Sequence, residues 1–242
     1  MDDVFFFLRS KARRSPLRGK DMTSETTRDA CLRSFLALLA ERPFARIALG
    51  DVAERCGVSL AQMRASFASP LDLLAAFFRA TDRHVLSEGG PDAEELAGEG
   101  PKERLFEVLM RRLDALEPHK EAVRSLNRSA RLDPLLALHL LRLSEGSQRW
   151  MLASAGIDCT GLAGSIRAKG LAVLFARVLG VWLEDEDPGL ARTMAALDQE
   201  LARGAKLLGM LDDVASIATP WRKRRGSAES REAAPAAGEP AA

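Results

Sequence analysis

Polar side chains between residues 59 and 66 are of the types that hydrogen-bond to DNA. Gln62 can pair with adenine through both the oxygen and the nitrogen of its side-chain amide, and Arg64 can pair with guanine or with a phosphate. Ser59 and Ser66 add hydroxyl groups, and Ser59 together with Arg46 would hold the sugar-phosphate backbone without reading the base sequence. The alternative is that these polar side chains are only solvated. The first interpretation predicts double-stranded DNA as a partner.

The stretch that carries these side chains, residues 49–68, is typical of two short helices joined by a tight turn. The apolar positions that close the two helices over a small core are Val52, Cys56, Val58 and Met63. Gly57 supplies the turn, because glycine reaches a positive φ without a steric penalty. Ser59 follows as an N-cap, whose hydroxyl accepts a hydrogen bond from a free N–H of the second helix. The pattern is that of a helix-turn-helix, whose second helix enters the DNA major groove.

Two longer amphipathic helices are predicted on either side of this motif. The first covers about residues 24–41, and its apolar stripe consists of Cys31, Phe35, Leu38 and Leu39. The second begins at Ser69-Pro70, a cap followed by proline at the first helical position, and reaches residue 87. Its core-facing residues are Leu73, Leu74, Phe77 and Phe78. Glycine and proline then make residues 88–101 a linker.

A second helical part is predicted beyond the linker. Helices are expected over residues 102–116, 118–130, 134–155, 160–184 and 189–211. The sequence lacks tyrosine and has few β-branched residues, so strands have little to form from and the predicted fold class is all-α. Large apolar side chains in this part either line a ligand pocket or are ordinary core: Leu109, Trp150, Met151, Phe175 and Trp182.

The ends of the chain differ in composition from its middle. The 242 residues carry a formal net charge of +1, but residues 1–20 hold six Lys or Arg against two acidic residues. Residues 1–22 are interpreted either as a disordered basic arm that contacts phosphate or as an extension upstream of a true start at Met22. Residues 219–242 begin with a basic run and are then rich in Ala, Pro, Glu and Gly, so we expect them to be disordered.

The sequence gives little support to chemistry other than binding. Cys31, Cys56 and Cys159 are far apart and set among apolar residues, as buried thiols in a reducing cytoplasm are. The cysteines and histidines show no metal-ligand spacing, so no metal and no cofactor are expected. No nucleophile with a base and no phosphate-binding loop is recognisable, which argues against an enzyme and leaves no catalytic residue to name. No apolar run is long enough to cross a bilayer, and we expect a cytoplasmic protein.

The amino-terminal part resembles the DNA-binding region of TetR-type transcriptional regulators. The resemblance covers residues 24–85 and is carried by Ala40-Glu41, Phe44, Asp51-Val52-Ala53, Cys56-Gly57-Val58-Ser59, Phe67, Ser69 and Leu73-Leu74. It implies a three-helix head at residues 23–68, a connecting helix at 69–87 and a helical regulatory and dimerisation body at 102–213. It also implies a homodimer formed through residues 160–211, operator DNA as a partner and a small apolar effector. The function expected from the resemblance is a dimeric transcriptional repressor.

The chain departs from the TetR pattern at two points. Met63-Arg64 stands where the family has Leu-Tyr, and Ser69-Pro70 stands where the family has Ser-Lys. In the family, the tyrosine and the lysine contact phosphate. Arg64 replaces the first contact with a charge, whereas Pro70 has neither a side-chain donor nor a backbone N–H. One phosphate contact that the resemblance implies is therefore missing.

The body shows a looser similarity to another group of proteins. Residues 103–213 are similar to the ubiquinone-biosynthesis accessory proteins of mitochondria and their bacterial relatives. The segments that carry this similarity are residues 109–120, Arg149-Trp150-Met151-Leu152 and Val181-Trp182. Those proteins keep the TetR fold and bind lipid or isoprenoid instead of DNA. The alternative function is therefore that of a lipid-binding accessory protein.

Overall fold

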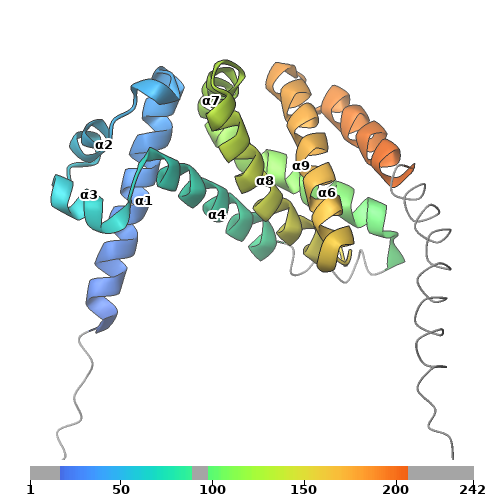
Figure 1. The fold of residues 1–242 in the computed structure, drawn as a ribbon, viewed down its shortest axis with the longest axis horizontal. Coiled ribbons are helices and arrows are strands. Elements are labelled where there is room, and N and C mark those ends of the chain that lie inside the picture. The colour runs from blue at the N-terminus through green and yellow to red at the C-terminus, as the bar shows by residue number, and fades with distance from the viewer. Residues whose placement is uncertain (1–16, 89–97, 207–242) are drawn as a thin grey trace, which may run out of the picture. The chain divides into compact units, whose positions relative to one another are not determined.

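The computed structural model describes residues 17–88 and 98–206, and every regular element in these residues is helical. The all-α prediction is therefore confirmed for the described part of the chain. The elements in chain order are α1 (Leu17–Glu41), η1 (Phe44–Arg46), α2 (Leu49–Cys56), α3 (Leu60–Ser66), α4 (Pro70–Glu88), α6 (Pro101–Leu116), η3 (Glu117–His119), α7 (Lys120–Leu132), α8 (Pro134–Ser154) and α9 (Gly161–Glu184) (Figure 1). A last helix covers residues 191–206.

The predicted helices agree with these bounds, with one clear difference at the beginning. α1 starts at Leu17, so the arm predicted over residues 1–22 overlaps the first turns of a helix that contains Met22. The remaining arm residues, the tail at 219–242 and the end of the helix predicted over 189–211 lie outside the described residues.

The chain divides into two compact units, which we describe separately. The first, called the head unit, contains the residues up to Ala80 together with Pro118–Ala137; the second, called the body unit, contains Thr81–Glu117 and the residues from Leu138 on. The head unit therefore includes α7, which the sequence places in a body at residues 102–213. The reason is packing that periodicity cannot show, because α7 lies along α1 and η1.

The head unit has a core formed by helix stripes of the expected spacing. Cys31, Phe35, Leu38 and Leu39 on α1 are all buried, as predicted. Val52 of α2 and Met63 of α3 are buried with them. Two serines of α7 hold the segment that follows α1. The Phe44 N–H donates to the Ser129 hydroxyl at 3.2 Å, and the Ser125 hydroxyl donates to the Arg42 carbonyl at 3.3 Å.

The body unit has an apolar core that surrounds a buried polar network. The fully buried large side chains include Leu109, Leu113, Met151, Trp182 and Leu197. Within this core, the Asp82 carboxylate of α4 accepts hydrogen bonds from the Arg112 guanidinium of α6 and the Ser147 hydroxyl of α8. All three residues are buried, and their hydrogen bonds link three helices at positions that are far apart in sequence.

Candidate DNA-binding interface

The helix-turn-helix begins with a carboxylate that holds the first turn of α2. Asp51 accepts a hydrogen bond from the Ala48 N–H at 3.1 Å and forms an ion pair with Arg42 at 2.8 Å. A negative charge in this turn is favourable, because the free N–H groups at a helix start carry partial positive charge. Asp51 therefore fixes where α2 begins and connects α2 to Arg42, the residue that follows α1.

The turn between α2 and α3 requires glycine. Gly57 has φ 72° and ψ 29°, in the left-handed region that residues with a side chain rarely adopt. Its N–H donates to the Glu54 carbonyl at 3.2 Å, and the Val58 N–H donates to the Ala53 carbonyl at 3.0 Å. These two bonds form a Schellman motif, which ends α2 and satisfies carbonyls left over at its end. The glycine turn predicted from the sequence is confirmed.

α3 begins with a reciprocal cap between Ser59 and Gln62. The Ser59 hydroxyl accepts from the Gln62 N–H at 3.2 Å, and Gln62 Oε1 accepts from the Ser59 N–H at 2.9 Å. The N-cap predicted at Ser59 is therefore confirmed. Gln62 Oε1 also accepts from the Ser59 hydroxyl at 3.1 Å, so both of its lone pairs are used and only the Nε2 group of Gln62 remains for DNA in this conformation. Bidentate pairing of Gln62 with adenine, as expected from the sequence, requires the side chain to leave this cap.

One apolar side chain anchors α3, and the others project outward. Met63 is 1 % exposed, whereas Leu60 is 64 % exposed and Arg64 is also exposed. Leu60 and Arg64 are four residues apart, so they share one face of the helix. The contacts predicted from the sequence did not include Leu60, although its spacing from Arg64 places both side chains on the same face of the helix. Its methyl groups suit apolar contact with the thymine methyl group in the major groove.

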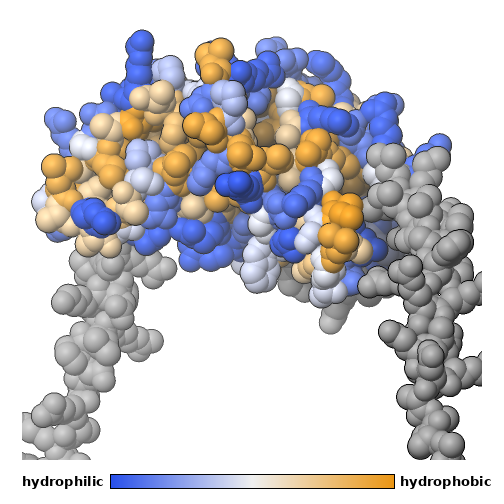
Figure 2. Space-filling model, in the orientation of Figure 1, coloured by the Kyte–Doolittle hydropathy of each residue, from blue (hydrophilic) through white to orange (hydrophobic). Residues whose placement is uncertain are grey.

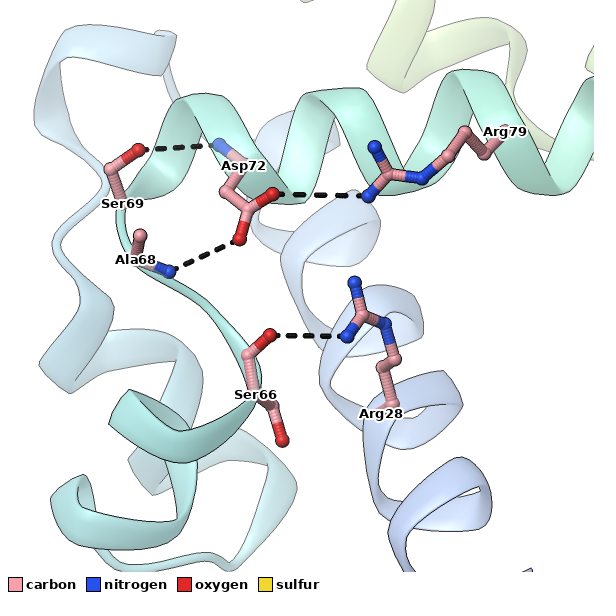
Figure 3. Close-up of polar contacts among 6 residues, drawn as sticks. All are labelled: Arg28, Ser66, Ala68, Ser69, Asp72 and Arg79. Carbon is pink, nitrogen blue, oxygen red and sulfur yellow. Dashed lines mark hydrogen bonds and ion pairs between the residues drawn. The ribbon is translucent and has the colours of Figure 1, made fainter. Parts of the chain in front are cut away.

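An arginine of α1 holds the end of α3. Arg28 donates from Nη1 to the Ser66 carbonyl at 3.2 Å (Figure 3). The Arg28 guanidinium carbon also lies 4.8 Å from the ring centroid of the buried Phe67. The carbonyl of Ser66 is therefore used within the head, and its hydroxyl remains as a candidate DNA contact. No sequence pattern singled out Arg28, because it is one of several charged residues on the polar side of α1.

The start of α4 is closed by a carboxylate of the protein itself. The Ser69 hydroxyl accepts from the Asp72 N–H at 3.3 Å, and Asp72 accepts from the Ala68 N–H at 3.1 Å (Figure 3). Asp72 also forms an ion pair with Arg79 at 3.8 Å. A DNA phosphate that approached this helix start would meet a like charge. The substitution to Pro70 is thus accompanied by a second feature that disfavours phosphate here.

Arg46 lies at the other end of the motif from α3. It is exposed, ends η1, and stands two residues before Ala48, which caps α2. The structure therefore places Arg46 beside the start of the helix-turn-helix, whereas Ser59, Gln62, Arg64 and Ser66 lie on α3 or cap it.

An exposed ion pair connects α2 to α1 on the polar side of the head. Arg55 donates from both terminal nitrogens to the two Glu41 carboxylate oxygens, at 2.7 and 2.6 Å. The hydrogen bond from Arg55 lowers the pKa of Glu41, and the same bond raises the pKa of Arg55. Both side chains stay charged over the pH range in which proteins fold, so the pair is a permanent feature of the head surface.

The residues expected to line a ligand pocket do not all lie in the interior of the body unit. Leu109, Met151, Phe175 and Trp182 are buried. Trp150 is 61 % exposed, because it is next to Met151 on α8 and therefore faces another side of that helix. The Arg112 guanidinium lies 5.7 Å from the ring centroid of Phe175, so this aromatic side chain is packed against the buried polar network.

Within residues 17–88 and 98–206, no cluster of three or more His, Cys, Asp or Glu side chains is suited to hold a metal ion. In the same residues, no helix has the length and apolarity needed to cross a bilayer.

Comparison with solved structures identifies the fold. The TetR transcriptional regulator from Nitrosomonas europaea ATCC 19718 is similar with a TM-score of 0.57 at 22 % sequence identity, over 74 % of this chain and 97 % of that chain. A TetR transcriptional regulator from Rhodococcus sp. RHA1 gives a TM-score of 0.55 at 17 % identity, over 74 % of this chain and 96 % of that chain. No protein-family model and no curated protein sequence matches the chain. The chain has the fold of TetR regulators, as predicted.

Proposed function

We propose that the protein is a TetR-type transcriptional regulator that binds operator DNA as a cytoplasmic homodimer and acts as a repressor. The observation that carries this proposal is α3, a helix capped at its start, anchored by the buried Met63 and otherwise projecting from the head. A helix held in this way is suited to enter the major groove, because its exposed side chains reach base edges without disturbing the core. The repressor role rests on the family resemblance.

The proposed contacts divide into base-reading and backbone-binding side chains. Arg64 and Leu60 share the exposed face of α3 and are the candidates for base contact, with Gln62 contributing Nε2. Arg46 and Ser66 are the candidates for phosphate contact, which fixes register without reading sequence, and Ser59 joins them when its hydroxyl proton is released from Gln62 Oε1.

The proposed dimer uses the exposed face of α9. The residues on this face are small or apolar apart from Lys169, Arg177 and the terminal Glu184, and they include Leu162, Ala163, Ile166, Gly170, Val173 and Ala176. Leu162 is 79 % exposed, and nothing lies within 4 Å of a Cβ built at Gly170. Figure 2 shows hydrophobic surface where α9 lies in Figure 1. Such a face is suited to pack against a two-fold related copy, because small residues let two helices approach closely.

Sedimentation at micromolar concentration tests the dimer. We expect a species of twice the chain mass of 26.3 kDa, and Leu162→Glu should convert it to the monomer, because no Lys or Arg stands three or four positions from residue 162 to pair with a buried carboxylate. The matched control is Leu132→Glu, which replaces an exposed leucine at the end of α7 and should leave the dimer intact. A wild-type monomer at this concentration would contradict the proposed interface.

We further propose that an effector bound by the body unit is mainly apolar but carries a polar group that pairs with Gln148. Gln148 is completely buried on α8, and neither polar atom of its amide has a hydrogen-bond partner within the described part of the chain. A buried polar group without a partner destabilises a protein by about 1–3 kcal/mol, so a ligand that supplies the partner gains that much. Gln148→Leu should therefore raise the Tm and weaken effector binding by about 5- to 150-fold, whereas the exposed Trp150→Leu should change neither.

Selection from random-sequence DNA tests the regulator directly, with native mass spectrometry of the purified protein beside it. We expect enrichment of a two-fold symmetric sequence, as a dimer with two α3 helices requires. Bound isoprenoid without enrichment of any sequence at low salt would support the lipid-binding alternative and overturn the regulator.

A further inference from the structure

Two thiols from neighbouring helices of the head unit lie close together. Cys31 is on α1 and Cys56 is the last residue of α2, and their sulfur atoms are 2.8 Å apart. The sulfurs of a disulfide are about 2.05 Å apart, so bond formation requires them to approach by less than about 1 Å. The two side chains already point toward each other across the contact between α1 and α2.

The two thiols differ in their access to solvent. Cys31 is 0 % exposed, whereas Cys56 is half-buried next to the Gly57 turn. Burial of Cys31, followed by its hydrogen bond with Cys56, raises the pKa of Cys31 to about 12. Cys31 is therefore a protonated thiol at neutral pH, and the thiolate is the reactive form of cysteine. A dissolved oxidant thus meets Cys56 first.

The third cysteine provides an internal reference. Cys159 belongs to the body unit, and its sulfur lies 3.8 Å from the Arg149 carbonyl oxygen. Cys56 has a similar contact with the Ala53 carbonyl oxygen at 3.6 Å, but it differs from Cys159 in having the Cys31 thiol as a neighbour.

We propose that Cys31 and Cys56 are a site of reversible oxidative modification, at which a peroxide forms a disulfide between α1 and the end of α2. In the first step, the Cys56 thiol loses its proton and the thiolate attacks the peroxide, the O–O bond breaks, and the sulfur becomes a sulfenic acid while the departing hydroxide takes up that proton and leaves as water. In the second step, the Cys31 sulfur attacks the Cys56 sulfur, the S–O bond breaks, and the departing hydroxide leaves as water with the Cys31 proton. The two sulfurs together lose two electrons, which the peroxide gains. A dithiol reverses the reaction by thiol–disulfide exchange.

The disulfide strengthens the head in its described arrangement. It closes a loop from Cys31 to Cys56 that contains η1 and all of α2, and such a closure limits the freedom of the unfolded chain. Because the sulfurs already face each other, the packing of α1 on α2 is kept and α3 stays in place. We expect oxidation to raise the Tm by about 5–10 °C. The reaction does not depend on DNA binding, so its test is independent of the proposed function.

Thiol counting in the full-length Cys159→Ser protein tests the proposal, because only Cys31 and Cys56 remain in it. The protein is treated with hydrogen peroxide, denatured and labelled with N-ethylmaleimide. We expect an intact mass lower by two hydrogens, no label, and a proteolytic fragment that joins positions 31 and 56. Dithiothreitol should restore both labelling sites. Labelling of both cysteines after peroxide treatment, or disulfides that form only between chains, would overturn the proposal.

Single-cysteine proteins test the order of the two steps. In the Cys159→Ser background, the Cys31→Ala protein should accumulate sulfenic acid at Cys56, which dimedone traps. The Cys56→Ala protein should leave Cys31 unreacted until it is denatured. Equal reaction of the two would contradict the order. The two-cysteine protein still decides whether the disulfide forms if either alanine variant does not fold.

Discussion

The head unit and the body unit use polar side chains in different ways. In the helix-turn-helix of the head unit and at the start of α4, carboxylates and hydroxyls lie at helix starts and bond to backbone within four residues, as do those of Asp51, Ser59, Ser69 and Asp72. In the body unit, Asp82, Arg112 and Ser147 are buried and bond between helices across 30 and 65 positions of the chain. The comparison shows that the caps of these short helices are set locally, whereas the buried network of the body depends on partners that only the fold brings together.

Removal of the buried carboxylate of the body should have the largest effect. The side chains of Asp82 and Arg112 are 12 % and 4 % exposed, so Asp82→Ala leaves the Arg112 charge in the interior without its carboxylate. We expect a loss of about 3–5 kcal/mol in the free energy of unfolding, measured by urea denaturation.

Two matched variants sharpen this prediction. Asp82→Leu combined with Arg112→Met should recover most of the loss, because two apolar side chains replace the pair. Glu41→Ala, which breaks the exposed Arg55 pair of the head, should change stability little because solvent screens it. A large loss of stability in Glu41→Ala together with a small loss in Asp82→Ala would contradict the difference described between the two units.

Gly57→Ala should have the next largest effect, and it lies in the head. Its backbone is left-handed at φ 72°, and nothing lies within 4 Å of an added Cβ, so the destabilisation comes from backbone strain alone. We expect a loss of about 1–2 kcal/mol in the free energy of unfolding, because residues other than glycine disfavour this backbone region.

Gly50→Ala is the matched control for Gly57. It is the second residue of α2 and has nothing within 4 Å of its added Cβ, so alanine should stabilise the protein by about 0.4–1 kcal/mol. Thermal unfolding of the two variants should therefore shift the Tm in opposite directions. Shifts of the same sign would contradict a turn that is set by local backbone conformation.

The reciprocal cap of α3 should give a smaller effect. Ser59→Ala removes the N-cap and should destabilise the protein by about 1 kcal/mol. Gln62→Ala removes the other half of the cap, so the double variant should lose less than the sum of the single variants. Additive losses in a denaturation cycle would show that the two side chains act separately and that Gln62 is free to reach a base.

The same local bonds explain how much was predictable from the sequence. Gly57, Ser59 and Ser69-Pro70 were identified because a turn or a cap needs particular residues at particular positions, and the buried stripe of α1 follows helical spacing. The role of Arg28 was not predictable, since it depends on the Ser66 carbonyl 38 positions away. The Cys31–Cys56 pair was missed for the same reason, because the sequence places the two cysteines far apart.

Two further differences follow from tertiary packing. α7 belongs to the head unit because Ser125 and Ser129 bond to the segment after α1, and no local pattern indicates those partners. Gln62 has the residue type of a base-reading side chain, but the structure uses its Oε1 in the cap of α3. Residue type alone therefore predicted where the candidate interface lies, but not which groups in it are free to bind.

Binding of wild-type and Arg64→Ala protein to the selected DNA sequence, measured by fluorescence anisotropy over a range of salt concentrations, tests the account most directly. Arg64 lies exposed on α3, so its loss should weaken binding. If Arg64 contacts one phosphate, the slope of log K against log salt should become less steep by about 0.9. If Arg64 pairs with guanine, its loss should cost about 1–3 kcal/mol of discrimination between sequences. The exposed Arg83→Ala on α4 should leave both affinity and slope unchanged. Identical binding curves for wild type and Arg64→Ala would contradict the assignment of α3 as the helix that reads DNA.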